Sequence, residues 1–227
     1  MQVHNETRNF QIHRIPLRLS NAYLLQKDDV ALLVDAGIPG ETERIMSHLQ
    51  RRGVKRLEFI FLTHAHYDHI GSAAELRRQS GARILIQEAD MGPLMRGETH
   101  LGEVRGRGRL SAWLLPLIER ILPVDPVEPD LVFNDTFEIP DLGVQALAMH
   151  VPGHTLGSSV LLVERFELFA GDLVSSTGRP HPQRYYAQDW DAIQHSLSMI
   201  QKLQPTRTYP GHGHDWIELK DLLALAI

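Results

Sequence analysis

The most informative stretch of the chain reads Thr63-His64-Ala65-His66-Tyr67-Asp68-His69, with three histidines and one aspartate between positions 64 and 69. It follows directly after the apolar run at residues 57–62, which predicts a buried strand. Neutral imidazole and carboxylate are ligands that zinc and similar first-row metals prefer. Burying these groups together without a cation would be costly, because buried polar groups need partners. The stretch therefore predicts a metal site at the end of a strand.

The composition limits the class of protein. A length of 227 residues is enough for one domain with a substantial core. A net charge of −5, without a long run of Lys and Arg, argues against a nucleic-acid partner. No apolar run approaches the roughly 20 residues of a membrane span, and residues 1–11 lack the apolar segment of a secretory signal. We therefore expect no membrane partner and a cytoplasmic location.

The absence of cysteine narrows the chemistry further. With no cysteine in the chain, disulfides and thiolate ligands are both excluded. Any metal must then be bound by His, Asp or Glu side chains.

Apolar runs and helical periodicity alternate along the chain. Short runs at 21–25 and 30–34 predict a hairpin. Helices are expected over residues 41–52, 70–79, 189–203 and 216–227, with Asp189 as the N-cap of the third. Hairpins and helices interleaved in two similar halves predict an α/β fold with two sheets between helical layers.

Four other segments also place a polar donor just after an apolar strand. They contain Asp35, His154 in Pro152-Gly153-His154-Thr155, Asp172 in Gly171-Asp172, and His212 in Pro210-Gly211-His212-Gly213. Loops at strand ends are where α/β folds usually gather functional groups. One such turn alone is more often a solvated loop than a metal ligand, so the argument depends on the set.

Taken in order with the first stretch, these segments resemble the motifs of the metallo-β-lactamase-fold hydrolases over nearly the whole chain. The resemblance implies a four-layer αββα sandwich, a single metallo-β-lactamase-like domain over residues 1–227, with a dinuclear site at one edge. It implies that the first metal is bound by His64, His66 and His154, the second by Asp68, His69 and His212, and both by a bridging Asp172. Asp68 is also the candidate catalytic carboxylate, and Asp35 would support the metal loop from behind.

This ligand set predicts a dinuclear metal-dependent hydrolase acting on a small molecule. A metal-bound hydroxide, available because zinc lowers the pKa of bound water to about 7, would attack a thioester, a lactone or a related ester. We expect two divalent ions, with zinc favoured and iron or manganese as alternatives, since His/Asp sites accept all of these. Two other activities stay open: a mononuclear iron persulfide dioxygenase, and a phosphoester hydrolase on the same fold. A non-catalytic binding protein is disfavoured by the complete ligand set.

The chain differs from several branches of these hydrolases, and the differences limit which branch it can resemble. The cysteine-containing zinc β-lactamases are excluded, and the other dinuclear lactamase branch generally lacks an aspartate like Asp172. Glyoxalase II resembles the chain in all the ligand motifs, but it carries a helical domain after its last ligand, whereas 15 residues (213–227) follow His212 here. The N-acyl-homoserine lactonases have a tyrosine where this chain has Ser175. The sequence therefore predicts a glyoxalase II-like or lactonase-like branch, not a substrate.

Residues 91–130 interrupt the alternation of strands and helices. They are rich in Gly, Arg and Pro, and then carry an apolar helical face, with Pro116 expected in the first turn of that helix. One interpretation is a helical cap that lines an acyl pocket, with Arg105, Arg107 or Arg109 contacting an anionic group. The other is a homodimer interface or a surface cover. The sequence favours neither.

Overall fold

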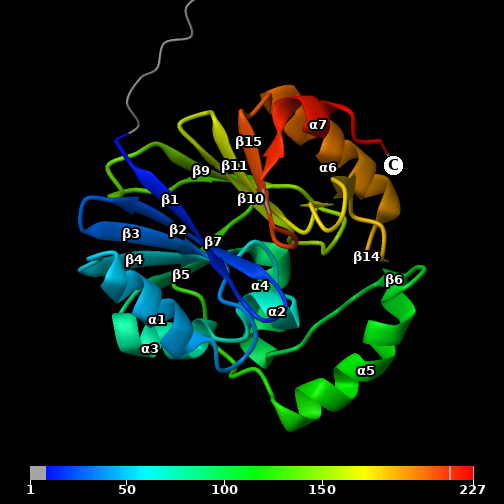
Figure 1. Cartoon of the computed structure of the whole chain (residues 1–227). Coiled ribbons are helices and arrows are strands. Elements are labelled where there is room, and N and C mark those ends of the chain that lie inside the picture. Colours follow the sequence, from blue (N-terminus) through cyan, green and yellow to red (C-terminus); the bar gives the residue numbers. More distant parts are fainter. Residues whose placement is uncertain (1–8, 215, 227) are drawn as a thin grey trace, which may run out of the picture.

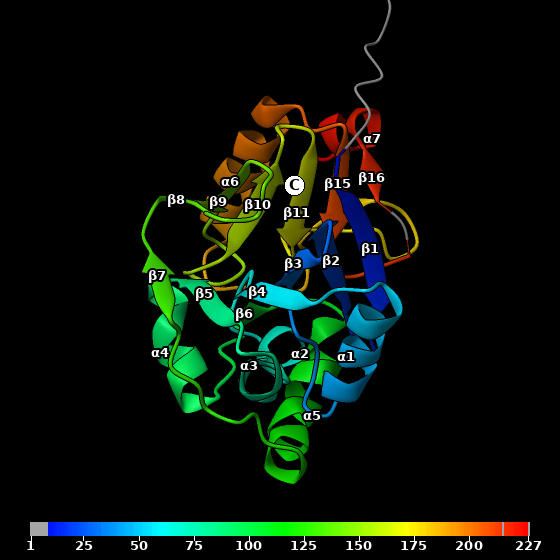
Figure 2. The same cartoon turned by 90° about the vertical axis from the view of Figure 1, so that its left-hand side faces the viewer.

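Two six-stranded sheets lie face to face at the centre of the computed structural model, which describes residues 9–214 and 216–226 (Figures 1 and 2). The first sheet has the order β1 (Gln11–Pro16), β2 (Asn21–Lys27), β3 (Val30–Val34), β4 (Arg56–Phe61), β5 (Arg83–Gln87) and β7 (Leu131–Phe133). The second has the order β16 (Ile217–Glu218), β15 (Arg207–Pro210), β11 (Glu167–Gly171), β10 (Ser159–Val163), β9 (Ala146–His150) and β8 (Thr136–Glu138).

Helices cover the outer face of each sheet. The first sheet carries α1 (Thr42–Arg51), α3 (Ala73–Ser80) and α4 (Glu88–Arg96), and the second carries α6 (Trp190–Leu203) and α7 (Leu219–Leu223) (Figure 2). The short helix α2 (Tyr67–Ile70) lies within the histidine stretch. Each layer boundary has its own apolar core: Leu76 packs under the first sheet, Phe169 between the sheets and Ile200 under the second. The predicted αββα sandwich is therefore confirmed.

Strand direction collects the polar loops at one edge. Strands β3, β4, β5 and β7 are parallel neighbours, so their carboxyl ends lie at the same edge of the first sheet. Strand β11 likewise runs parallel to β15 in the second sheet. The loops that follow β3, β4, β11 and β15 begin at Asp35, Leu62, Asp172 and Gly211.

Residues 97–122 extend away from this body. They contain β6 (Glu103–Val104) and helix α5 (Gly108–Ile121), which projects from the rest of the chain (Figure 1). The strand β6 pairs with β14 (Tyr186–Ala187), and β12 (Val174–Ser175) pairs with β13 (His181–Pro182). Helix α4 belongs to the body instead, since Leu94 is fully buried in the first core. Within the described ranges, no helix is long and apolar enough to span a bilayer.

Of three helix features predicted from the sequence, one is confirmed and two are wrong. Helix α6 begins as predicted, with Asp189 Oδ1 accepting hydrogen bonds of 3.0 Å from the main-chain nitrogens of Asp191 and Ala192. The expected helix over 216–227 was wrong at both ends, because residues 217–218 pair with β15 as strand β16 and α7 ends at Leu223; residue 227 lies outside the described residues. Pro116 lies inside α5 and not in its first turn.

Gly71, two residues after the histidine stretch, lets the main chain of residues 38–39 approach so closely that a side chain should not be tolerated there. A Cβ there would lie 2.4 Å from the carbonyl carbon of Ile38 and from the nitrogen of Pro39. We expect Gly71→Ala to lower the free energy of unfolding by roughly 1–3 kcal/mol through overpacking. Urea denaturation measures this free energy.

As the control, Gly92→Ala in α4 would meet only the flexible Arg96 side chain, at 3.2 Å. It should be neutral or stabilising by up to about 1 kcal/mol, and equal effects of the two variants would contradict the explanation.

Candidate metal centre

The structure brings the side chains of all seven predicted ligands together at one edge of the sandwich. They form three overlapping groups whose nitrogen or oxygen atoms lie within 4.8 Å of one another: His64, His66 and His154; His64, His69 and Asp172; Asp68, His69 and His212. The first and third groups contain the same residues as the two metal sites that the family resemblance implied. The donor set of imidazoles and carboxylates suits a divalent metal ion, while the role of each residue as a ligand stays a prediction.

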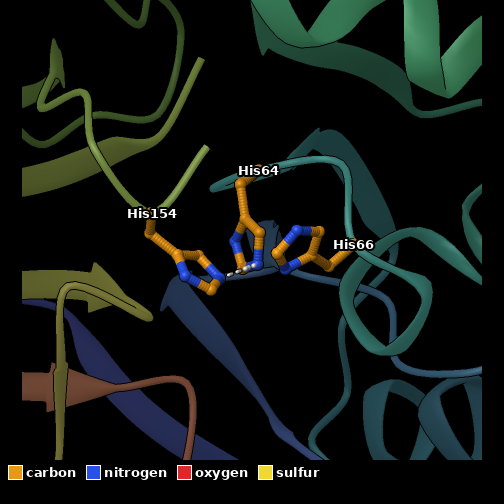
Figure 3. Close-up of side chains that lie close together, drawn as sticks. All are labelled: His64, His66 and His154. Carbon is orange, nitrogen blue, oxygen red and sulfur yellow. Dashed lines mark hydrogen bonds between the residues drawn. The ribbon is translucent and has the colours of Figure 1, made fainter. Parts of the chain in front are cut away.

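The first group is deeply buried and contains only imidazoles. His64 and His66 come from the loop after β4, and His154 from the loop after β9, so both sheets contribute (Figure 3). The three side chains are between 1% and 4% exposed. The Nε2 atoms of His64 and His154 lie 3.2 Å apart. This geometry fits three imidazoles that face one common point.

The second group is more open and includes a carboxylate. The Asp68 Oδ2 atom lies 3.8 Å from His69 Nε2 and 3.4 Å from His212 Nε2. The side chain of His69 is fully buried, whereas those of Asp68 and His212 are 22% and 30% exposed. The second group is therefore the one that solvent can reach.

Asp172 lies between the two groups. Its Oδ2 atom is 3.5 Å from His154 Nε2 and 3.1 Å from His212 Nε2. Its Oδ1 atom is 3.3 Å from His69 Nε2. One carboxylate thus contacts members of both groups, as a bridging ligand would.

For four of the five histidines, a hydrogen bond behind the ring leaves the other nitrogen free to face the centre. The contacts are His64 Nδ1 to Thr63 Oγ1 at 3.0 Å, His66 Nε2 to the main-chain oxygen of His100 at 3.2 Å, His69 Nδ1 to Asp35 Oδ2 at 2.8 Å, and His154 Nδ1 to the main-chain oxygen of Tyr186 at 3.0 Å. A metal-binding histidine is usually oriented in this way, by a partner on its other nitrogen.

Asp35 supports the histidine stretch from behind, as expected. Its carboxylate accepts a hydrogen bond of 2.8 Å from the main-chain nitrogen of Thr63, in addition to the one from His69. Its backbone has a φ of 61°, in the left-handed region that aspartate tolerates better than most residues. The unusual backbone aims the carboxylate at the neighbouring loop.

Burial holds the first group in the form that binds metals. It lowers the pKa of His64 well below its usual range, and it also lowers the pKa of His66. For His154, burial and the neighbouring His66 lower the pKa to about 4. These imidazoles are therefore neutral at physiological pH, and neutral imidazole is the ligating form.

In the second group the pKa values of the histidines are raised, because carboxylates face these side chains. Burial opposes protonation of His212, but Asp172 raises its pKa to about 9. Burial likewise opposes protonation of His69, whose pKa Asp35 and Asp172 hold well above its usual range. Burial works against ionisation of Asp172, yet His212 and His69 keep its pKa well below the usual value. Positive charge is thus favoured at this point, and a divalent cation would supply it in place of protons.

Two buried atoms support the same conclusion. His69 Nε2 and Asp172 Oδ1 lie 3.3 Å apart as an ion pair, but neither makes a hydrogen bond of good geometry within the described part of the chain. Unpartnered buried polar atoms are uncommon in native proteins, and an ion is one explanation for them. The residues present therefore fit a divalent metal.

Asp90 is a supporting residue that the sequence interpretation missed. It is 2% exposed, at the start of α4. Its carboxylate accepts hydrogen bonds from the main-chain nitrogens of Ala65 at 2.7 Å and Gly157 at 2.9 Å, and from Thr155 Oγ1 at 2.8 Å. It therefore ties the histidine stretch to the loop that carries His154. Its position just after β5 is the same strand-end signal that marked the other loops.

We expect Asp90→Asn to lower metal affinity by roughly 10- to 100-fold, the usual range for a residue that orients ligands. The amide keeps the size of the carboxylate but cannot accept hydrogen bonds on both sides. Metal titration against a chelator measures the affinity. Asp130→Asn is the matched control, because Asp130 accepts a hydrogen bond of 2.9 Å from the main-chain nitrogen of Ile84 in the first sheet. It should alter stability without altering metal affinity, and unchanged affinity in Asp90→Asn would refute the role.

Comparison with known proteins agrees with this geometry. A family model described as the metallo-beta-lactamase superfamily matches residues 15–212. The chain is 27% identical over 215 residues to a probable metallo-hydrolase of Methanocaldococcus jannaschii, covering 91% of this chain and 92% of that protein. It is 26% identical over 211 residues to a hydroxyacylglutathione hydrolase of Tolumonas auensis, covering 92% of this chain and 68% of the relative.

Solved structures show the same fold. The B3 metallo-beta-lactamase BLEG-1 superposes with a TM-score of 0.72 at 24% identity, covering 93% of this chain and 95% of that one. An archaeal metallo-beta-lactamase superfamily protein of Sulfolobus tokodaii superposes with a TM-score of 0.68 at 21% identity, covering 93% and 83% of the two chains. At these identities the likeness concerns the fold alone. Since the family model matches most of the sequence, the chain belongs to the metallo-beta-lactamase superfamily.

Proposed function

We propose that this chain is a dinuclear metal-dependent hydrolase of a thioester, a lactone or a related ester, with zinc as the first candidate metal. The observation that carries the proposal is the position of Asp172 between two groups of donors, within 3.5 Å of His154 and 3.1 Å of His212. A mononuclear site would not need the second group, in which Asp68 and His212 complete a separate set around His69.

When bound, the metals would supply an activated water at neutral pH and polarise the carbonyl group of the substrate. The chain itself provides the positions of the reacting groups. His64, His66 and His154 are fixed by burial and by the hydrogen bonds behind them. Asp68 faces the open side, where its carboxylate can orient a reacting water or accept its proton.

A cavity beside the second group supports a small-molecule substrate. Its volume is about 350 Å³, and its lining includes His66, Asp68, Asp172 and His212. That volume lies at the lower end of the usual range for ligand pockets. The relative from Tolumonas auensis is named as a hydrolase of hydroxyacylglutathione, which favours acyl compounds within the proposed class.

The deciding experiment combines metal analysis with a substrate panel. Protein reconstituted with zinc should contain about two ions per chain and should hydrolyse at least one thioester or lactone. Asp172→Ala should lose metal, and we expect its rate to fall at least 100-fold, because one carboxylate serves both sites. The control is Asp29→Ala, in the turn before β3 and thus at the opposite end of that strand from Asp35. It should keep both metal and activity.

Three outcomes would contradict the proposal. Full activity in Asp172→Ala would show that the dinuclear assignment is wrong. One iron per chain, with oxygen uptake on a persulfide, would replace hydrolysis by dioxygenation. Cleavage of phosphoesters alone would replace the acyl substrate class.

A further inference from the structure

Helix α5 carries two different apolar stripes. Ser111, Leu114, Leu115 and Ile118 line the 350 Å³ cavity, and their spacing of three and four residues places them on one helical face. A second stripe, which includes Trp113 and Leu117, is exposed to solvent, at 76% and 57%. The projecting helix therefore forms one wall of the cavity with only one of its faces.

The lining of this cavity is partly apolar and partly polar. Leucine and isoleucine side chains of α5 form one wall, together with Leu101. Asp68, Asp172 and His212 of the metal centre line it as well. A ligand that satisfies both parts has an apolar tail and a polar head that reaches the centre.

A second cavity, of about 230 Å³, shares Asp172 and His212 with the first. Its lining adds polar side chains, among them Thr177, His181 and Arg184. Tyr186 lines both cavities, and its hydroxyl group contacts Ser111 of α5 as well as the main-chain oxygen of Gly108, the latter at 3.2 Å. The metal centre thus lies where an apolar space and a more polar space adjoin.

We propose that the 350 Å³ cavity under α5 binds the unbranched acyl chain of the substrate, and that the 230 Å³ cavity receives the leaving group. This inference rests on the proposed hydrolase function. The lining residues from Ser111 to Ile118 span about 10 Å of helix, at a rise of about 1.5 Å per residue. An extended chain of about eight carbons, with bonds of about 1.5 Å, has a similar length.

The reaction assigned to this site is balanced by water alone. The hydroxyl of water forms a bond to the acyl carbon, and the bond from that carbon to oxygen or sulfur breaks. One proton of the water goes to the departing alcohol or thiol, and a medium-chain carboxylic acid remains as the second product, which releases its own proton to solvent and becomes a carboxylate.

Chain-length dependence tests the proposal. On zinc-loaded protein, we measure kcat/KM for a series of acyl thioesters from acetyl to decanoyl. Each added methylene should raise kcat/KM about threefold to fourfold up to about eight carbons, since burying one is worth about 0.8 kcal/mol. Leu114→Asn should lower kcat/KM for the octanoyl compound about tenfold or more, and should lower it far less for the acetyl compound. Leu117→Asn is the matched control on the exposed stripe and should change neither rate.

A binding measurement separates this inference from the proposed function. Octanoate should bind the zinc-loaded protein in a calorimetric titration, and Leu114→Asn should weaken binding about tenfold, whereas Leu117→Asn should not. Failure of octanoate to bind would overturn the acyl pocket, whatever the activity. Metal-dependent cleavage of the acetyl compound without a preference for longer chains, or equal effects of the two leucine variants, would also overturn it while the hydrolase function stands. Absence of cleavage with octanoate binding intact would reject the hydrolase function alone.

Discussion

The hydrogen bonds of the buried Asp35 carboxylate are the constraint on which the rest of the centre depends. This side chain joins the loop after β3 to the loop after β4, because it binds both Thr63 and His69. Main-chain bonds strengthen the same junction, from Asp35 to Phe61 at 2.9 Å and from Ala36 to His69 at 2.7 Å. A carboxylate that is 1% exposed has few ways to satisfy its charge. The position of the histidine stretch is thereby fixed before any metal is considered.

Much of the fold and of the ligand set could be predicted from the sequence, because both depend on local patterns. Apolar runs mark the strands, and a donor directly after each of several strands falls at one edge once neighbouring strands are parallel. His154, Asp172 and His212 lie far from His64 in the chain, yet each follows a strand of the sandwich. The strand direction, which the sequence does not display, is what converts these separate turns into one centre.

The supporting contacts could not be predicted, since they depend on distances across the fold. Asp90 is 25 residues from Ala65 and 67 from Gly157, and its position after β5 marks a strand end without indicating which loops it links. The main-chain oxygen of Tyr186 orients His154 through a contact that any residue could make at that position. The orientation of α5 was equally hidden, because the sequence predicted one apolar face, which the structure divides into two stripes. Only the structure distinguishes the stripe that lines a cavity from the one that faces solvent.

The two groups of donors differ in burial, and this difference suits them to different roles. His64 and His154 are each 1% exposed, whereas the side chains of Asp68 and His212 are 22% and 30% exposed and line the cavity. A molecule entering under α5 therefore meets Asp68 and His212 of the second group and, of the first group, His66. Electrostatic effects are stronger where water is excluded, so the buried group is suited to holding an ion firmly. The open group is suited to exchanging water for substrate. Asp172 contacts members of both groups, and the ring centroids of His69 and His64 lie 4.1 Å apart, so a change at the open group can reach the buried one directly.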